Sequence, residues 1–342
     1  MLENKDQQDI IHVDAEKPTP IYRQIIQSIE LAIENGKLTK GDLVPSVNAT
    51  AAQFNIARGS IFKAYNHLRT EGIIDSIPGK GYFVISTKQS KKKNIFLLLS
   101  TYNPYREVFY NALIKTLKNQ ATVDIYFHHH NIDVFETLIN SHSSHYNTFV
   151  IMPENHTRSE KILKSLDQKQ LYILETGLSK FGDQYAGIYQ NYRKDIYDFL
   201  SGIKERLVSY KRIILLFSSN MRNYEVITGF QDFSNEHTEY SMEVIQETET
   251  FLPKRGDLCL VMDDNDLVRL ILYSRENKNW TLGSEIGLIS YHETPLKSII
   301  GNGISTISPD FEQMGKAMAS LLIKNGNWVK ENAFRLIDRG SF

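Results

Sequence analysis

The chain has 342 residues, 41% of them hydrophobic, and a formal net charge of -1 at pH 7. Its length exceeds that of a typical single domain, and its near-neutral charge excludes a protein that binds nucleic acid through its overall charge. The single cysteine, Cys259, excludes an intrachain disulfide framework and suits a reducing cytoplasm. The N-terminus is polar and acidic, and no apolar run approaches ~20 residues, so we expect a soluble cytoplasmic protein without a membrane segment.

The first predicted elements are two amphipathic helices. Apolar residues recur at helical spacing over residues 22–34, and Asn35-Gly36 is a usual C-terminal cap. Ser46 is the expected N-cap of the second helix. The residues of this helix that we expect to face inward are Ala49, Ala52 and Phe54.

A third helix is expected to begin near Arg58 and to end at Glu71-Gly72. Its apolar stripe consists of Ile61, Ala64, Tyr65 and Leu68. Two short strands, 73–76 and 81–84, should follow around the turn Pro78-Gly79-Lys80-Gly81. Two helices joined by a short turn and followed by a two-stranded wing are a device for placing a helix in a DNA groove.

This arrangement predicts which residues of the third helix contact DNA. Arg58 and Ser60 lie at the N-terminal end, which normally enters the major groove first. Arg58 can pair bidentately with guanine, and Ser60 suits a phosphate or a base edge. The helix face opposite the apolar stripe carries Gly59, Phe62, Lys63 and Asn66. The alternative is an ordinary solvated helix face.

The turn of the wing predicts a further DNA contact. Lys80 lies between Gly79 and Gly81, which allow the chain to approach DNA closely. Its ammonium group could therefore reach the phosphate backbone or the minor groove.

Residues 20–84 closely resemble the winged helix-turn-helix domain of GntR-type bacterial transcription regulators. The resemblance implies that Arg58, Ser60 and the wing glycines contact operator DNA, and Ser46 and Asn48 of the second helix complete the expected set. Many members carry Arg where this chain has Asn48, and Ser or Thr where it has Ala57. A contact from the second helix is therefore expected to be weaker here, or to have a changed preference. The matching positions are Pro20-Ile21-Tyr22, Gly36, Gly41-Asp42, Pro45-Ser46, Arg58, Ala64-Tyr65, Leu68, Glu71-Gly72, Gly79-Lys80-Gly81 and Phe83-Val84.

A polar, lysine-rich linker is predicted over residues 86–94, between a DNA-binding domain at 1–85 and a second region at 95–342. Its centre is Gln89-Ser90-Lys91-Lys92-Lys93. The segment is expected to act as a solvated hinge, and its lysines could also lie along DNA phosphates.

From residue 95 onward, strand and helix patterns alternate. This alternation predicts an α/β fold with parallel sheets covered on both faces, and the length allows two lobes. Ligands of open α/β folds bind at the carboxyl ends of the strands, so we expect a site between the lobes. The predicted strands are 95–99, 123–127, 148–152, 171–174, 186–189, 212–217, 241–244, 257–262 and 286–290. The predicted helices are 108–119, 134–141, 193–205, 223–235 and 311–324.

The order of motifs in residues 94–342 resembles the two-lobed, periplasmic-binding-protein-like sensor domain of LacI-type repressors. The corresponding pieces are Asn103-Pro104-Tyr105 after the first strand, Leu174-Glu175, Gly229-Phe230 after a loop with Arg222, Asp263 to Asp266, Ser290 to Leu296, and Ile304 to Phe311. A GntR-type head joined to such a sensor occurs in sugar-utilisation regulators, especially arabinose- and fucose-type ones.

The resemblance implies a set of residues that contact a small-molecule effector. An aromatic residue after the first strand could stack on a sugar ring, and charged residues could bind hydroxyls or an anionic group. The expected set is Tyr102, Arg106, Phe109, Glu175, Arg222, Asp263, His292 and Glu293. For each of them a purely structural role is the alternative. His292 replaces a familiar Asp, Pro309 a frequent polar contact and Asp263 a common Asn, so the ligand cannot be taken from well-known relatives.

Other patterns argue against catalysis and cofactors. His128-His129-His130 looks metal-like, but consecutive strand residues alternate between faces, so all three cannot converge on one ion. Asp263 to Asp266 resembles the start of a calcium loop without its Gly and Glu. No nucleophile elbow, Walker-A loop or zinc signature occurs, so neither an enzyme nor a bound metal or cofactor is expected.

The predicted function is a homodimeric, ligand-responsive regulator that binds double-stranded operator DNA. A repressor of carbohydrate-utilisation genes that a sugar releases is the main hypothesis. The alternatives are an activator, a small-molecule binding protein with a degenerate DNA head, and an enzyme that uses the carboxylates of the cleft. The sequence names neither the effector nor the operator.

Overall fold

The computed structural model describes residues 10–14, 16, 19–86, 93–143, 145–175, 185–218, 223–277 and 279–342. The chain forms two compact units. One unit comprises Met1–Thr101 and Leu117–Ala186, and the other comprises Tyr102–Thr116 and Gly187–Phe342.

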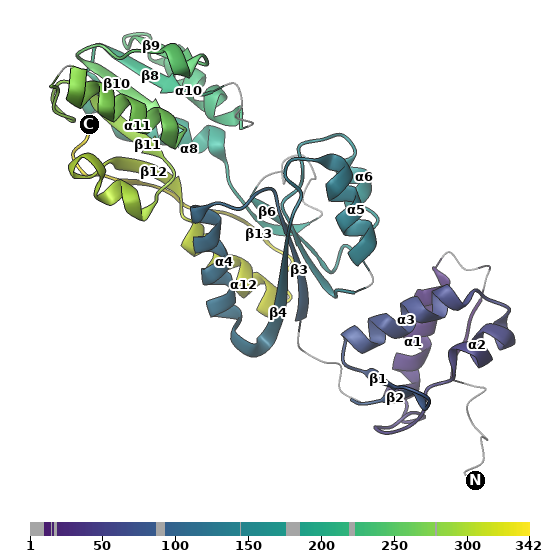
Figure 1. The fold of residues 1–342 in the computed structure, drawn as a ribbon. Coiled ribbons are helices and arrows are strands. Elements are labelled where there is room, and N and C mark those ends of the chain that lie inside the picture. The colour runs from purple at the N-terminus through teal and green to yellow at the C-terminus, as the bar shows by residue number, and fades with distance from the viewer. Residues whose placement is uncertain are drawn as a thin grey trace. The chain divides into compact units, whose positions relative to one another are not determined.

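The N-terminal part of the first unit is a small helical domain with a two-stranded wing (Figure 1). Its elements are α1 (Ile21–Glu34), α2 (Val47–Phe54), α3 (Arg58–Thr70), β1 (Ile74–Ile77) and β2 (Gly81–Val84). The apolar stripe of α3 packs in the core, and all four of its predicted residues are fully buried. The hydroxyl group of Tyr65 donates to the carbonyl of Pro45 at 2.5 Å, which joins α3 to the turn before α2. The helix-turn-helix and wing predictions are therefore confirmed.

The inward face of α2 differs from the prediction. Ala49 and Ala52 are exposed, and the buried residues are Val47 and Thr50, with Phe54 half-buried. Ser46 caps the helix as predicted, since its hydroxyl oxygen accepts from the backbone N–H of Ala49 at 3.1 Å. Because the helix starts directly after Ser46, the stripe at i, i+3 and i+7 runs through Val47, Thr50 and Phe54.

The wing is an antiparallel pair in which Ile74 faces Val84 and Ile77 faces Gly81. Residues 41–44 extend it, because the N–H of Val44 donates to the carbonyl of Tyr82 at 2.9 Å and that of Val84 donates to Asp42 at 2.9 Å. This third segment ties the wing to the turn before α2.

The remainder of the first unit is a parallel sheet with helices. The strands lie in the order β6-β5-β3-β4 and all pair in parallel, as predicted. They are β3 (Lys93–Leu99), β4 (Ala121–Phe127), β5 (Thr148–Ile151) and β6 (Leu171–Glu175), with helices α5 (Ile132–His142) and α6 (Ser159–Leu163) and a 3-10 turn, η2 (Lys118–Gln120).

The second unit contains a six-stranded sheet in the order β14-β12-β11-β10-β8-β9. Neighbouring strands in this sheet pair in parallel, except that β14 at the edge runs antiparallel to β12. The sequence predicted only parallel strands, so the prediction was wrong for this edge. The strands are β8 (Arg212–Leu216), β9 (Met242–Ile245), β10 (Asp257–Val261), β11 (Gly287–Tyr291), β12 (Ser305–Pro309) and β14 (Phe334–Ile337). Strands β7 (Ala186–Tyr189) and β13 (Val329–Glu331) pair in parallel and belong to the other six-stranded sheet, whose full order is β13-β7-β6-β5-β3-β4.

Both faces of the six-stranded sheet are covered by helices (Figure 1). Ile213 and Leu215 of β8 face α8 and α10, whereas Ile214 and Leu216 face α11. This double burial explains the continuous apolar runs of the strands. The helices of the unit are α4 (Pro104–Leu117), α8 (Tyr192–Gly202), α9 (Lys204–Leu207), α10 (Glu225–Glu236), α11 (Asp264–Leu272) and α12 (Phe311–Ile323). The short turns are η4 (Thr248–Thr250), η5 (Tyr273–Asn277), η6 (Pro295–Ser298) and η7 (Ile300–Asn302).

Glycines allow two close helix contacts in this unit. A Cβ atom on Gly229 of α10 would lie 2.1 Å from the carbonyl oxygen of Arg193 in α8. A Cβ atom on Gly315 of α12 would lie 2.4 Å from the carbonyl oxygen of Phe109 in α4. Since real Cβ atoms do not approach backbone oxygens so closely, both helix pairs depend on glycine.

A buried polar chain connects β7, α8 and the segment after β13. The side-chain amide of Gln190 donates to Asp195 at 2.6 Å, and that of Asn332 donates to Gln190 at 2.8 Å. All three side chains are buried. Burial raises the pKa of the Asp195 carboxyl group from 3.8 to about 7, and the hydrogen bond from Gln190 only partly opposes this shift.

Asp195→Asn should therefore stabilise the protein in a pH-dependent way. Because folding raises this pKa, the contribution of Asp195 to stability is present below about pH 4 and is lost as the pH rises to about 7. The isosteric amide avoids burying a charge, so the variant should gain roughly 1–3 kcal/mol of unfolding free energy at pH 8 and almost nothing at pH 4. Urea unfolding at both pH values measures this. An equal change at both would show that the carboxyl group does not titrate between them.

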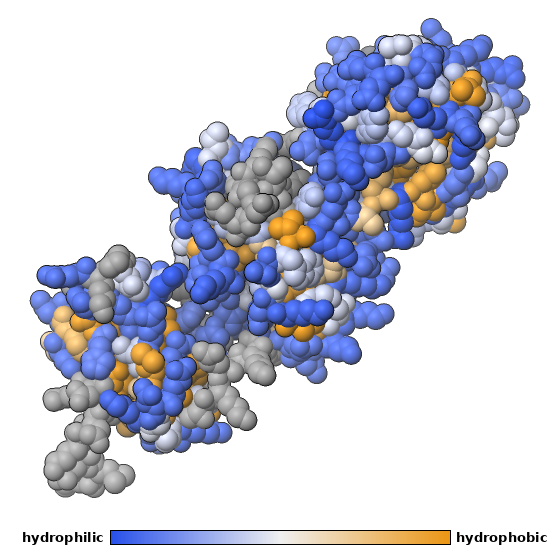
Figure 2. Space-filling model, turned by 180° about the vertical axis from the view of Figure 1, so that it is seen from behind, coloured by the Kyte–Doolittle hydropathy of each residue, from blue (hydrophilic) through white to orange (hydrophobic). Residues whose placement is uncertain are grey.

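Among the residues that the structure describes, no helix is long and apolar enough to cross a membrane. On the face shown in Figure 2, hydrophilic residues predominate and hydrophobic residues gather in separate patches.

Candidate functional site

The N-terminal half of α3 presents the predicted DNA-contacting residues. Arg58 and Gly59 are exposed, and Ser60 and Lys63 are half-buried. The ammonium group of Lys63 lies 4.4 Å from the ring centre of Tyr22 in α1, a cation–π contact that it would have to leave in order to reach a phosphate. Ala57 precedes the helix and provides no side-chain cap. A DNA phosphate could accept the first N–H groups of α3 in place of a capping hydroxyl.

The second helix and the wing present the other predicted residues. Asn48 is exposed, and the hydroxyl group of Ser46 already caps α2. Gly79 has φ 76° and Gly81 has φ 101°, which are backbone conformations that favour glycine, and Lys80 between them is exposed. The turn therefore holds the Lys80 backbone at the tip of the wing.

In the second unit, His292 is the predicted effector residue with the most distinctive surroundings. The Tyr105 ring stacks on the His292 ring with centroids 3.9 Å apart, and Phe311 lies 4.8 Å from Tyr105. The pKa of His292 is lowered well below its usual value, first by burial of the ring and then by the positive charges of Lys297 and Arg106. The imidazole is therefore neutral at physiological pH, and it offers a flat aromatic face rather than a charge.

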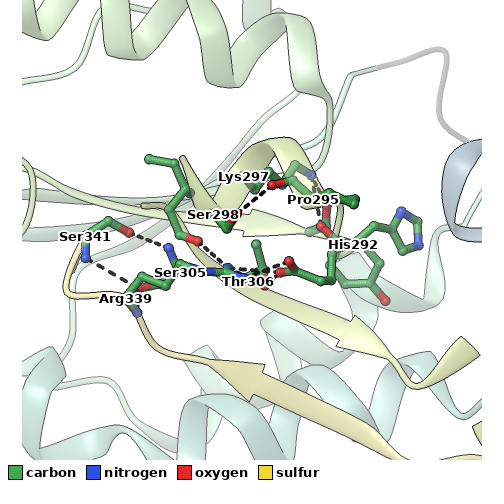
Figure 3. A network of polar contacts seen from close by, with 11 residues as sticks. His292, Pro295, Lys297, Ser298, Ser305, Thr306, Arg339 and Ser341 are labelled. Carbon is green, nitrogen blue, oxygen red and sulfur yellow. Dashed lines mark hydrogen bonds and ion pairs between the residues drawn. The ribbon is translucent and has the colours of Figure 1, made fainter. Parts of the chain in front are cut away.

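Glu293 is held by the protein itself. The guanidinium group of Arg339 donates to both carboxylate oxygens, at 2.7 and 3.0 Å, and Thr306 also donates to this carboxylate. Figure 3 shows Arg339 and Thr306 in one network with Ser305 and Ser341. Burial alone would raise the pKa of Glu293, but these hydrogen bonds hold it below its usual value. The carboxylate therefore stabilises the C-terminal segment against β12.

Lys297 anchors the loop that carries His292. Its side chain is buried, and its ammonium group donates to the carbonyls of Tyr291 and His292, at 2.9 Å each. Asp264 forms an ion pair with it at 2.7 Å. This anchor holds His292 in the left-handed region at φ 63°. The neighbouring Asp263 caps α11 by accepting from the N–H of Asn265 at 2.8 Å, which is a structural role.

The other predicted effector residues lie in different environments. Arg106 and Phe109 are buried in α4, whereas Tyr102 is 60% exposed and its hydroxyl group donates to Glu107 at 2.8 Å. Glu175 is buried at the end of β6, in the first unit. Arg222 lies outside the described residues, as does most of the predicted linker. Within the second unit, the positive charge of Arg106 acts on His292 and lowers its pKa.

The three consecutive histidines do not lie in a strand, as the sequence argument assumed, because β4 ends at Phe127 and His129 and His130 have φ 48° and 57°. His128 and His130 both approach one carboxylate oxygen of Glu154, at 3.5 and 3.1 Å, whereas His129 lies beside Phe127. Among the described residues, no group of three or more His, Cys, Asp or Glu side chains is placed to hold a metal ion.

Comparison with known proteins assigns the N-terminal domain. Residues 21–84 match the model of the bacterial regulatory proteins of the gntR family. The transcriptional repressor YtrA of Bacillus subtilis is 36% identical over 75 residues, which are 22% of this chain and 58% of that protein. The repressor NagR of the same organism is 32% identical over 81 residues, or 24% of this chain and 33% of that protein. The similarity thus spans less than two thirds of these relatives.

Residues 21–84 form a GntR-family helix-turn-helix domain.

The rest of the chain has the two-sheet α/β fold of periplasmic-binding-protein-like LacI regulators. A LacI family transcriptional regulator from Lactobacillus casei with bound glucose aligns with a TM-score of 0.57 at 16% identity, over 73% of this chain and 99% of that chain. The trehalose repressor from Escherichia coli aligns with a TM-score of 0.59 at 11% identity, over 72% and 99%. The resemblance to both families is confirmed for the folds, whereas an arabinose or fucose specificity is not shown.

Several residues around these sites were missing from the predicted set. Tyr105 and Phe311 belong to quoted motifs, so the aromatic residue after Pro104 was a usable signal for the stack with His292. Lys297 directly follows the Thr-Pro-Leu motif, and its burial has no local signature. Arg339 lies 46 residues from its partner Glu293 and could not have been found by spacing.

Proposed function

We propose that this protein is a transcription regulator that binds operator DNA through its GntR domain and responds to a small molecule held by its α/β region. The observation that carries the proposal is a GntR-family domain that presents the exposed N-terminal end of α3 with Arg58. Relatives of this domain are named as repressors, among them YtrA, NagR and MngR, a mannosyl-D-glycerate transport/metabolism system repressor. The proposed organisation is a DNA-binding domain at residues 1–85, a linker at 86–94 and an effector domain at 95–342.

The proposed DNA contacts combine base reading with phosphate contacts. Arg58 would read a guanine, and Ser60 and the first N–H groups of α3 would bind phosphates. Lys80 would contact the backbone from the wing. The proposed set is Ser46, Asn48, Arg58, Gly59, Ser60, Lys63, Gly79, Lys80 and Gly81.

We propose a carbohydrate or carbohydrate derivative as the effector and carbohydrate-utilisation genes as the target. Proteins with the same fold hold glucose and ribose. The aromatic cluster of Tyr105 and His292 would provide an apolar surface for a sugar ring, and Arg106, whose charge acts on His292, suits hydroxyls or an anionic group. The effector would bind one arrangement of the α/β region better and would thereby shift the population away from the DNA-bound form.

The test starts from DNA selected by the full chain from a random library. Its affinity is then measured with and without monosaccharides, disaccharides and their phosphates. An active effector should weaken DNA binding by ~5- to 150-fold, and the DNA should weaken effector binding by the same factor. If the full chain selects no sequence, the proposal of a DNA-binding regulator fails. If DNA is bound but no carbohydrate changes its affinity, the effector class is wrong.

Tyr105→Ala should abolish the response to the effector and leave DNA affinity within about two-fold, since Tyr105 lies outside the GntR domain. Tyr105→Phe is the matched control, because it keeps the stacked ring and should keep the response. Release of DNA by Tyr105→Ala at the normal effector concentration would show that Tyr105 is not in the site.

We also propose that the protein acts as a homodimer, because one winged helix-turn-helix domain binds a short half-site weakly and operator symmetry mirrors protein symmetry. The full chain should sediment as a dimer at micromolar concentration. A strict monomer under these conditions would refute the dimer.

A further inference from the structure

Phe62 stands apart from the other large apolar residues of α3. Ile61, Tyr65 and Leu68 are fully buried, whereas 46% of the Phe62 surface is exposed. Its ring has no aromatic or cation–π partner among the described residues. Single exposed apolar residues are common, so the exposure of Phe62 alone indicates no function. What the ring can contact depends on where Phe62 lies on the helix.

Phe62 lies on the helix face that the proposed function turns toward DNA. It follows Arg58 by four residues and Gly59 by three, so these residues share one face of α3. Gly59 is exposed, and a Cβ atom added to it would meet nothing within 4 Å. Because Gly59 lacks a side chain, the first turn of α3 can approach the floor of a groove closely enough for the Phe62 ring to reach a base edge.

The chemistry of the ring selects its partner. Phenylalanine neither donates nor accepts hydrogen bonds, so it cannot read the polar edges of guanine, cytosine or adenine. The C5-methyl group of thymine is the apolar group that the major groove presents. Four helical residues span about 6 Å and one base pair about 3.4 Å, so Phe62 would reach within about two base pairs of the pair read by Arg58.

We propose that Phe62 is a specificity-determining residue that contacts a thymine methyl group in the operator half-site. The proposal rests on the proposed DNA-binding function, and it adds a base that neither Arg58 nor the wing would read. The two should therefore act independently: Arg58 selects a guanine, and Phe62 selects a thymine within about two base pairs of it.

The experiment removes the methyl group and nothing else. In the DNA selected by the full chain, each thymine of the half-site is replaced in turn by deoxyuridine. The unsubstituted protein should lose about four-fold in affinity at one position, which is the effect expected for one buried methyl-sized group. Phe62→Ala should bind the thymine and uracil forms equally at that position. Phe62→Leu keeps an apolar contact and should keep part of the preference.

Two controls separate the possible failures. Arg58→Ala should lose its guanine preference but retain the uracil penalty at the position read by Phe62. Thermal unfolding of Phe62→Ala checks that the GntR domain still folds, as expected for a partly exposed residue. A full chain that binds its selected DNA but ignores every uracil overturns the assignment of Phe62. An equal penalty in the unsubstituted protein and in Phe62→Ala also overturns it. If the full chain selects no DNA sequence, the proposed function itself is contradicted.

Discussion

Arg58→Ala should weaken specific DNA binding by about 1–3 kcal/mol, which corresponds to roughly 5- to 150-fold in affinity. Arg58 is exposed at the start of α3, where its guanidinium group can form two hydrogen bonds to one guanine. Loss of both bonds should also relax the preference at that single base pair. Fluorescence anisotropy with the selected DNA and with single-base variants measures the two effects together.

Lys80→Ala is the contrasting variant. A phosphate contact from the wing carries no base preference, so this change should weaken binding to all sequences by a similar factor and reduce the salt slope by about one. Unchanged affinity for the selected DNA in Arg58→Ala would contradict the proposed docking of α3.

Arg339→Ala should lower the free energy of unfolding by roughly 2–4 kcal/mol, because it leaves the partly buried Glu293 carboxylate without its bidentate partner. It also removes the donor to the carbonyl of Ile304 at 2.8 Å. The matched control is Arg275→Ala, which breaks an exposed ion pair with Glu276 and should change stability by less than about 0.5 kcal/mol.

The pH dependence of this loss provides a second measurement. Arg339 and Thr306 hold the pKa of Glu293 below its usual value of 4.5, so the contribution of Glu293 is present above that pH and is lost as the pH falls through the lowered pKa. Denaturant unfolding should therefore show a smaller difference between the two proteins at about pH 3 than at pH 7. A loss of the same size at both pH values would mean that Arg339 acts through packing alone.

The fold was readable from the sequence where burial leaves a regular pattern. The prediction of the apolar stripe of α3 was correct, because Ile61 and Leu68 lie at helical spacing and both are buried. The central strands β3, β5, β6, β8, β10 and β11 were found as apolar runs, since both faces of each of them are buried. Strand β12, the short edge strands β13 and β14, and helices α6 and α11 were not predicted, because their patterns are brief or polar.

The prediction of the inward face of α2 was wrong for a local reason. Alanine fits both buried and exposed helix positions, so Ala49 and Ala52 carry little information about orientation. Val47, the first residue of the helix, decides which face is inward.

The site was less readable than the fold. Charged residues in a motif suggest ligand contacts, but their role depends on which partners the fold brings to them. Glu293 meets Arg339, and Asp263 caps a helix, so two of the predicted effector carboxylates already have structural tasks. The motif around His292 indicated the right loop, whereas its stack with Tyr105 depends on a helix almost 190 residues earlier.

The neutral His292 ring has a consequence for the conditions under which the protein would operate. A free imidazole titrates near pH 6.5. Burial against Tyr105, together with the charges of Lys297 and Arg106, moves the titration of His292 well below that value. The proposed binding of an effector at this ring should therefore change little as the pH falls through about 6.5.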